Sequence, residues 1–171
     1  RAIAYMSRKR IPVHMDEPTY KALTERFGYC FEGKGGYPAI LDGRNDLRIG
    51  ERFEIDGPGG RLQVLPMDQD HGGIRSLGFR FGSIAYCNDV VHLPDETLDA
   101  LSGAKTLIVD ALRYDPHPSH SHLERSLEWI EQIKPDKAFL TNLHVDMDYD
   151  TLLKELPDNV FPAYDGMSVQ S

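Results

Sequence analysis

The sequence predicts an α/β fold in which a strand-rich first half is followed by alternating strands and helices. Residues 105–110 and 137–141 are short apolar runs of the kind found in strands that are covered on both faces. Residues 61–66 and 76–82 alternate apolar with polar side chains, which is typical of half-buried strands. An apolar stripe at helical period lies between the two covered strands and consists of Leu123, Leu127, Ile130 and Ile133. This order of elements predicts helices layered on a sheet.

The first half opens with a segment that reads as the middle of a helix, followed by a strand-like run at residues 11–15. Asp16 is in position to cap a helix, and Gly28 is predicted to end it. The next stretch is rich in glycine and turn residues. Short strands are expected there at residues 38–41 and 51–55.

The second half supplies the remaining elements. Residues 83–87 form a shorter, more uniformly apolar strand. Each of the helices that follow has a glycine or proline at its end, and the first two begin at a capping residue. They are expected from Asp95 to Gly103, from Ser121 (with Glu124 in a capping box) to Pro135, and from Tyr149 to Pro157.

Composition limits the class of protein. The chain has 171 residues, of which 40% are hydrophobic, so it is the size of one domain with a real core. No apolar run approaches the roughly 18–20 residues of a membrane span. The net charge of −8 argues against a long nucleic acid as partner. The only cysteines, Cys30 and Cys87, form no CxxC motif, and we expect a reducing cytoplasmic location.

Polar residues at the ends of apolar runs are the candidates for chemistry. These residues are His71, Asp89, His120 and His144. In an open α/β sheet, ligands and metals gather at the carboxyl ends of the strands. Three imidazoles and a carboxylate on one such edge predict part of a metal site with a proton donor beside it. Asp110 ends the clearest strand, and Asp146 lies close to His144, so both are candidates for orienting an imidazole.

Each residue also has a structural interpretation. His71 and His144 lie in acidic turns where a solvated histidine is ordinary, and Asp89 could pair with an arginine. Asp95 already accounts for the next helix cap. The histidines in the run 117–122 could form an exposed, weakly metal-binding tract, or the helix start beyond them could favour a bound anion.

The order of short motifs resembles the second half of the metallo-β-lactamase superfamily. The motifs are His-Gly at 71–72, Leu-Gly-Phe-Arg-Phe-Gly at 77–82, Ala-Tyr-Cys-Asn-Asp-Val at 85–90, Pro-His-Pro-Ser-His at 116–120, Phe-Leu-Thr-Asn-Leu-His at 139–144 and Ala-Tyr-Asp-Gly-Met at 163–167. The resemblance covers essentially the whole chain. It is greatest to the phosphodiesterase branch, typified by cyclic phosphate phosphodiesterases, with ribonuclease Z as a cousin.

This resemblance implies an αββα sandwich, of which residues 1–171 would be the second half to two-thirds, the C-terminal portion of a single domain. It also implies two divalent metal ions, Zn or Mn. His71 would be a ligand of the first ion, Asp89 would bridge the two, and His144 would bind the second. His120 resembles the active-site histidine of the branch. Many relatives have Thr-His where this chain has Thr141-Asn142, and their last ligand falls one position after His144.

The implied activity is hydrolysis of a phosphodiester in a small cyclic phosphate or nucleotide, with His120 as general acid. The alternatives are a tRNA-processing endonuclease of the ribonuclease Z type and a nucleotide-binding relative without catalysis. The H-x-H-x-D-H loop of the superfamily is absent from this sequence, so the 171 residues alone are expected to be poorly active. The expected partner is a small phosphorylated molecule, and relatives of this kind often form homodimers.

Overall fold

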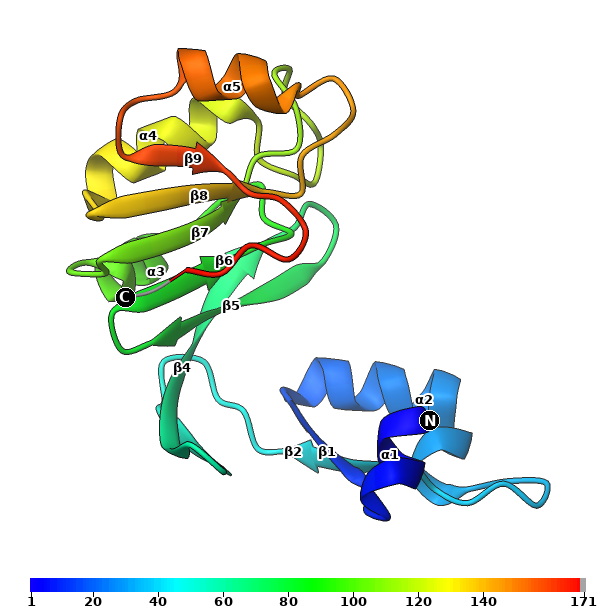
Figure 1. Ribbon diagram of the computed structural model, residues 1–171. Coiled ribbons are helices and arrows are strands. Elements are labelled where there is room, and N and C mark those ends of the chain that lie inside the picture. Colours follow the sequence, from blue (N-terminus) through cyan, green and yellow to red (C-terminus); the bar gives the residue numbers. More distant parts are fainter. Residues whose placement is uncertain (170–171) are drawn as a thin grey trace. The chain divides into compact units, whose positions relative to one another are not determined.

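The computed structural model describes residues 1–169 and contains two compact units (Figure 1). The first is Arg1–Glu51, and the second begins at Arg52. In the described part of the chain, no helix is both long and apolar enough to cross a membrane. The expectation that all residues belong to one domain stays a prediction.

The first unit consists of α1 (Ala2–Ser7), β1 (Ile11–Met15), α2 (Glu17–Glu32) and β2 (Leu41–Asn45). The strands pair in parallel, with Ile11 opposite Leu41. Asp16 caps α2 as expected, because its carboxylate accepts a hydrogen bond of 3.1 Å from the Thr19 amide.

Two expectations for the first unit were wrong. Gly28 does not end α2. The helix instead bends at Phe27, where φ is −125°, and continues to Gly33, whose φ of +78° suits glycine. Strand β2 begins at Leu41, where the strand predicted for residues 38–41 was to end. A glycine that is tolerated at a bend carries the same sequence signal as one that stops a helix.

The second unit is built on one sheet. Within residues 1–169, the sheet has seven strands in the order β3-β4-β5-β6-β7-β8-β9. Their bounds are β3 Phe53–Gly57, β4 Gly60–Asp70, β5 Arg75–Phe81, β6 Ile84–Cys87, β7 Thr106–Asp110, β8 Lys137–Thr141 and β9 Val160–Pro162. Strand β4 is longer than predicted and ends directly before His71, while the three-residue strand β9 was not predicted at all.

Strand direction decides which residues share an edge of this sheet. Strand β4 is antiparallel to β5, which is antiparallel to β6, so β4 and β6 run the same way. Strands β6, β7, β8 and β9 pair in parallel. The carboxyl ends of β4, β6, β7, β8 and β9 therefore lie at one edge of the sheet, which we call the carboxyl edge.

The helices of the second unit are α3 (Asp95–Leu101), α4 (Leu123–Ile133) and α5 (Tyr149–Glu155). Helices α3 and α4 lie behind the central strands in Figure 1. Their apolar residues join those of the sheet in one buried cluster, which includes Leu101, Trp129 and Ile130 from the helices and Leu107 and Leu140 from the strands. Burial of this face is what holds the carboxyl edge in place.

The helix starts differ in detail from the prediction. Asp95 is the first residue of α3, and Pro94 occupies the cap position. His122 caps α4 without a side-chain hydrogen bond. The Ser121 hydroxyl instead bonds to Ser126 at 2.7 Å inside the unit, so burial overrides the predicted capping box.

Candidate metal centre

His71 follows β4 at the carboxyl edge, in a tight turn closed by its own amide, which donates to the Ile74 carbonyl at 2.9 Å. The next residue, Gly72, has a φ of +74° and lies against the 117–120 segment. A Cβ at this position would lie 2.7 Å from the Pro118 carbonyl oxygen. Glycine thus allows the two loops to approach each other. The His71 ring then donates from Nδ1 to the Ser119 carbonyl at 2.7 Å.

Asp89 follows β6 in a left-handed conformation, with a φ of +54°. Its carbonyl accepts a hydrogen bond of 2.6 Å from the Ser76 hydroxyl of β5. Gln69 of β4, only 1% exposed, donates to that hydroxyl at 3.0 Å and to the Asn88 carbonyl at 2.9 Å. We call this set (Gln69, Ser76, Asn88 and Asp89) the Gln69 network. It holds the Asp89 backbone in a conformation that costs energy for a residue other than glycine.

His120 lies between two carboxylates. Its Nδ1 is 2.8 Å from Asp110, the last residue of β7, and 3.8 Å from Asp89. Asp110 is fully buried and also accepts hydrogen bonds from the Val90 amide at 3.2 Å and from the Asn142 side chain at 3.1 Å. Three hydrogen bonds satisfy this buried carboxylate and fix its orientation. Asp110 is in position to orient His120, and the orienting role that the sequence suggested for it stays a prediction.

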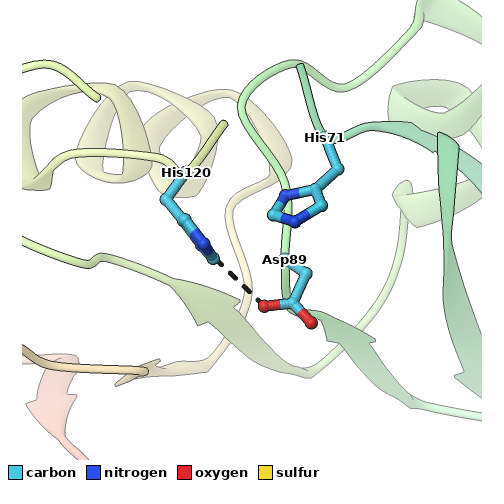
Figure 2. Close-up of side chains that lie close together, drawn as sticks. All are labelled: His71, Asp89 and His120. Atoms are coloured by element: carbon cyan, nitrogen blue, oxygen red, sulfur yellow. Dashed lines mark ion pairs between the residues drawn. The ribbon is translucent and has the colours of Figure 1, made fainter. Parts of the chain in front are cut away.

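The side chains of His71, Asp89 and His120 converge. One donor atom from each lies within 4.8 Å of those of the others, and Figure 2 shows the three side chains turned toward a common point. The His71 and His120 ring centroids are 4.7 Å apart, with the rings edge to face. Loops after β4, β6 and β7 supply these residues, so the strand directions bring together positions that are far apart in sequence.

This donor set fits a divalent metal ion. Imidazole nitrogen and carboxylate oxygen are ligands that suit Zn²⁺ and Mn²⁺. Two atoms bound to one ion at about 2.1 Å can be about 4.2 Å apart at most. A spread of 4.8 Å is slightly wider than that, and it is within the span of two ions about 3.5–4 Å apart. The residues present are therefore suited to part of a metal centre.

The tautomers of the neutral histidines follow from their partners. A carbonyl oxygen can only accept, so Nδ1 of His71 carries the proton and Nε2 keeps its lone pair. The carboxylate of Asp110 sets the same tautomer in His120. His144 lies after β8, and its Nδ1 is 2.9 Å from Asp146. In all three rings an oxygen partner on Nδ1 leaves Nε2 available to a ligand or a proton.

His144 is not among the three converging side chains. Its amide donates to the Leu112 carbonyl at 2.8 Å, which ties the loop after β8 to the loop after β7. Its ligand role, like those of His71 and Asp89, stays a prediction. Asp146 is placed on its ring, as an orienting carboxylate would be.

His117 belongs to the same histidine run and packs beside His120, with ring centroids 5.2 Å apart. Its Nδ1 is 3.3 Å from the amides of Ser119 and His120, which donate to it. Partial desolvation and then the nearby Arg113 charge lower the pKa of His117. A neutral His117 thus accepts hydrogen bonds that shape the loop carrying His120.

Several residues of the site were missed from the sequence. Gln69 and Ser76 lie inside strands, where a polar residue reads as facing solvent. Asn142 was noted only as a departure from the resemblance, and the structure places it on Asp110, beside the His120 ring. The signal that could have found Gln69 is Gly78. A Cβ at Gly78 would lie 2.5 Å from the Gln69 Oε1 atom, so the glycine leaves space for that amide.

The chain is similar to known proteins over most of its length. A solved structure described as a new diphosphatase from the PhnP family is 29% identical, with a TM-score of 0.81 over 95% of this chain. A second, Zn²⁺-bound PqqB from Methylobacterium extorquens, is 12% identical with a TM-score of 0.70 over 95% of this chain, and it shares the fold. The chain spans 59% of the diphosphatase and 66% of PqqB.

Sequence comparison also finds a curated relative, an octanoyltransferase from Porphyromonas gingivalis, with 26% identity over 163 residues. The match covers 93% of this chain and 32% of that protein. Residues 1–142 match the family described as the beta-lactamase superfamily domain. This match confirms the predicted fold class, and it confirms the resemblance that the motifs suggested. The chain therefore belongs to the metallo-β-lactamase superfamily, and its sheet and helices are part of that fold.

Proposed function

We propose that this chain is part of a metal-dependent hydrolase that cleaves a phosphodiester in a small cyclic phosphate or nucleotide. The observation that carries the proposal is the convergence of His71, Asp89 and His120 at the carboxyl edge. The Nδ1 partners of both histidines leave Nε2 free. Such a centre needs nitrogen and carboxylate donors for metal and a separate group that moves a proton.

The metal ligands in this proposal are His71, Asp89 and His144. Two divalent ions in such a site would supply an activated water and stabilise negative charge on the phosphoryl oxygens. The carboxylate of Asp89 is half-exposed and has no arginine partner among the described residues, so it is available to cations. The Ser119 carbonyl and the Asp146 carboxylate would keep the His71 and His144 rings in position.

His120 would act as general acid at the leaving oxygen. When its ring is protonated on both nitrogens, Nδ1–H remains on Asp110 and Nε2–H points away from it. The buried negative charge of Asp110 stabilises the imidazolium, and its hydrogen bond prevents the ring from turning. General acid catalysis of this kind contributes about 10²–10⁴-fold to a rate.

The comparisons support phosphoryl chemistry in a general way. The 29% identical diphosphatase acts on a phosphorus compound by its description, whereas the 12% identical PqqB supports the fold alone. The match with the octanoyltransferase covers only 32% of that protein. Its name therefore does not decide what the matching region does.

The test uses the whole protein that contains this chain, purified with Zn²⁺ or Mn²⁺. His120→Ala should leave the metal content unchanged and lower kcat on bis(p-nitrophenyl) phosphate by at least about 10²-fold. His122→Ala is the matched control, because His122 lies two positions away and makes no side-chain capping bond. Unchanged turnover in His120→Ala would remove this residue from the mechanism.

The alternatives predict different outcomes of the same assay. Cleavage of a precursor tRNA in preference to a cyclic nucleotide would favour the ribonuclease Z type of activity. Metal-free protein that binds a nucleotide without cleaving it would favour a binding relative. About two equivalents of metal with turnover of small phosphodiesters is the result that the proposal expects.

A further inference from the structure

A small polar cavity lies at the carboxyl ends of β8 and β9. Its volume is about 280 Å³, and it is lined by Thr141, Asn142, Leu143, Ala163, Tyr164 and Asp165. The Ala163 amide donates to the Leu140 carbonyl at 2.8 Å, which holds the segment after β9 against β8. The cavity is near the lower end of the volumes that hold small ligands, about 300 Å³.

Asn142 connects this cavity to the candidate general acid. Its side-chain nitrogen donates to Asp110 Oδ1 at 3.1 Å and lies 3.1 Å from the His120 ring, whose own proton goes to the other oxygen of Asp110. A general acid must lie within hydrogen-bond reach of the oxygen that leaves. The leaving group must therefore lie close to His120, and Asn142, whose side chain lies 3.1 Å from that ring, is one of the residues that line the cavity.

The charges around the cavity do not favour a phosphate as its occupant. No lysine or arginine is among the residues that line it, and the one ionisable acid there is Asp165. A carboxylate repels phosphate and accepts hydrogen bonds from hydroxyl or amino groups. The phosphoryl part of a substrate therefore belongs at the metal centre, and a neutral part with donor groups belongs in the cavity.

Tyr164 adds a surface for a flat ring. Its side chain is 57% exposed and packs edge to face on Tyr149, with centroids 6.1 Å apart and an angle of 78° between the rings. The turn that carries it is closed by the Met167 amide on the Tyr164 carbonyl at 3.0 Å, with Gly166 at a φ of +85°. Aromatic faces of this kind stack on nucleobases.

We propose that the cavity is the leaving-group pocket and binds a nucleoside, with the base on Tyr164 and the ribose 5′-hydroxyl donating to Asp165. This inference rests on the proposed function for the position of the leaving oxygen. The volume is of the order needed for one small ligand.

The experiment compares two substrates with the same reactive ring. Adenosine 2′,3′-cyclic phosphate carries a nucleoside, whereas ethylene phosphate has the five-membered cyclic phosphate alone. In the whole, metal-loaded protein, Tyr164→Leu should raise KM for the adenosine compound about tenfold or more, as expected for a lost stacking contact. The kcat/KM for ethylene phosphate should change less than about twofold.

Three further variants separate binding from folding. Tyr164→Phe keeps the ring and should behave as wild type. Asp165→Asn should raise KM for the adenosine compound, and Asp158→Asn, an exposed acid before β9, is its matched control. Equal losses on both substrates in Tyr164→Leu, or no loss on either, would overturn the inference.

Binding of free adenosine, followed by calorimetry, distinguishes the two proposals. If the protein cleaves no phosphodiester but binds adenosine, and Tyr164→Leu abolishes that binding, the pocket stands and the proposed function fails. If wild-type protein cleaves ethylene phosphate and does not bind adenosine, the pocket fails and the proposed function stands.

Discussion

Replacing Gly78 with alanine tests how the sheet holds the candidate metal ligand Asp89. A Cβ at this position would lie 2.5 Å from Gln69 Oε1, 3.1 Å from Gln69 Cδ and 3.3 Å from Cys87 Sγ. Gln69 is 1% exposed and Cys87 is fully buried, so neither side chain can move into solvent. The Gln69 amide must give way and break its bonds to Ser76 and Asn88.

The expected cost follows from these contacts. Overpacking of a buried site costs about 1–3 kcal/mol. Two hydrogen bonds lost inside the protein add about 1 kcal/mol each. Gly78→Ala should therefore lower the free energy of unfolding of the second unit by roughly 3–5 kcal/mol. It should also weaken metal binding, because the Gln69 network no longer holds the backbone of Asp89.

Urea unfolding measured by tryptophan fluorescence provides the assay. Trp129 is the only tryptophan of the chain and is buried in the core of the second unit, so its emission reports on that unit. Gly73→Ala is the matched control, because nothing lies within 4 Å of its added Cβ. In the double variant with Gln69→Ala the conflict with the Gln69 amide is absent and only the 3.3 Å contact with Cys87 Sγ remains, so Gly78→Ala should cost much less stability in that background. A change below about 0.5 kcal/mol in Gly78→Ala would refute the reasoning.

Three other predictions concern the same unit. Asp110→Asn keeps the size of the side chain and removes its charge. In steady-state kinetics kcat should fall by about 10²-fold or more, with the metal content unchanged. A fall of less than about threefold would count against the orienting role of Asp110. Burial raises the pKa of the Cys87 thiol from 9.0 to about 12, so a thiol reagent at pH 8 should label Cys30 and spare Cys87, as mass spectrometry would report. Because the unfolded thiol ionises near pH 9.0, this group's contribution to stability should be present below that pH and be lost as the pH rises toward 12. Gly72→Ala places a Cβ 2.7 Å from the Pro118 carbonyl oxygen at a φ of +74°, so it should lower both thermal stability and metal affinity. An unchanged melting temperature would exclude the close approach of the two loops at Gly72.

The sequence predicted the central strands because their apolar side chains are stable only when they are buried away from water. Residues 105–110 and 137–141 are such runs, and they are β7 and β8. Gly28 misled the prediction, since α2 bends near it and continues. Strand β9 was missed because three residues are too few to show a period.

For the candidate site, the position of a residue at the end of a strand was informative. Strands that run in the same direction end at the same edge of the sheet, so residues that follow them lie close together. His71, Asp89 and His120 are brought together in this way. Gln69 and Asn142 were not predicted as parts of the site, because their roles depend on cross-strand and cross-loop partners. Which residues face each other across a sheet depends on register, and register is set by the packing of the whole sheet.

The central claim is that the loops after β4 and β6 bring His71 and Asp89 into one metal centre. Diffraction from crystals of the whole protein grown with Zn²⁺, recorded at the zinc absorption edge, tests this claim most directly. An anomalous peak about 2.0–2.2 Å from both a His71 ring nitrogen and an Asp89 carboxylate oxygen is the predicted result. Zinc bound elsewhere, with both of these side chains free of metal, would contradict it.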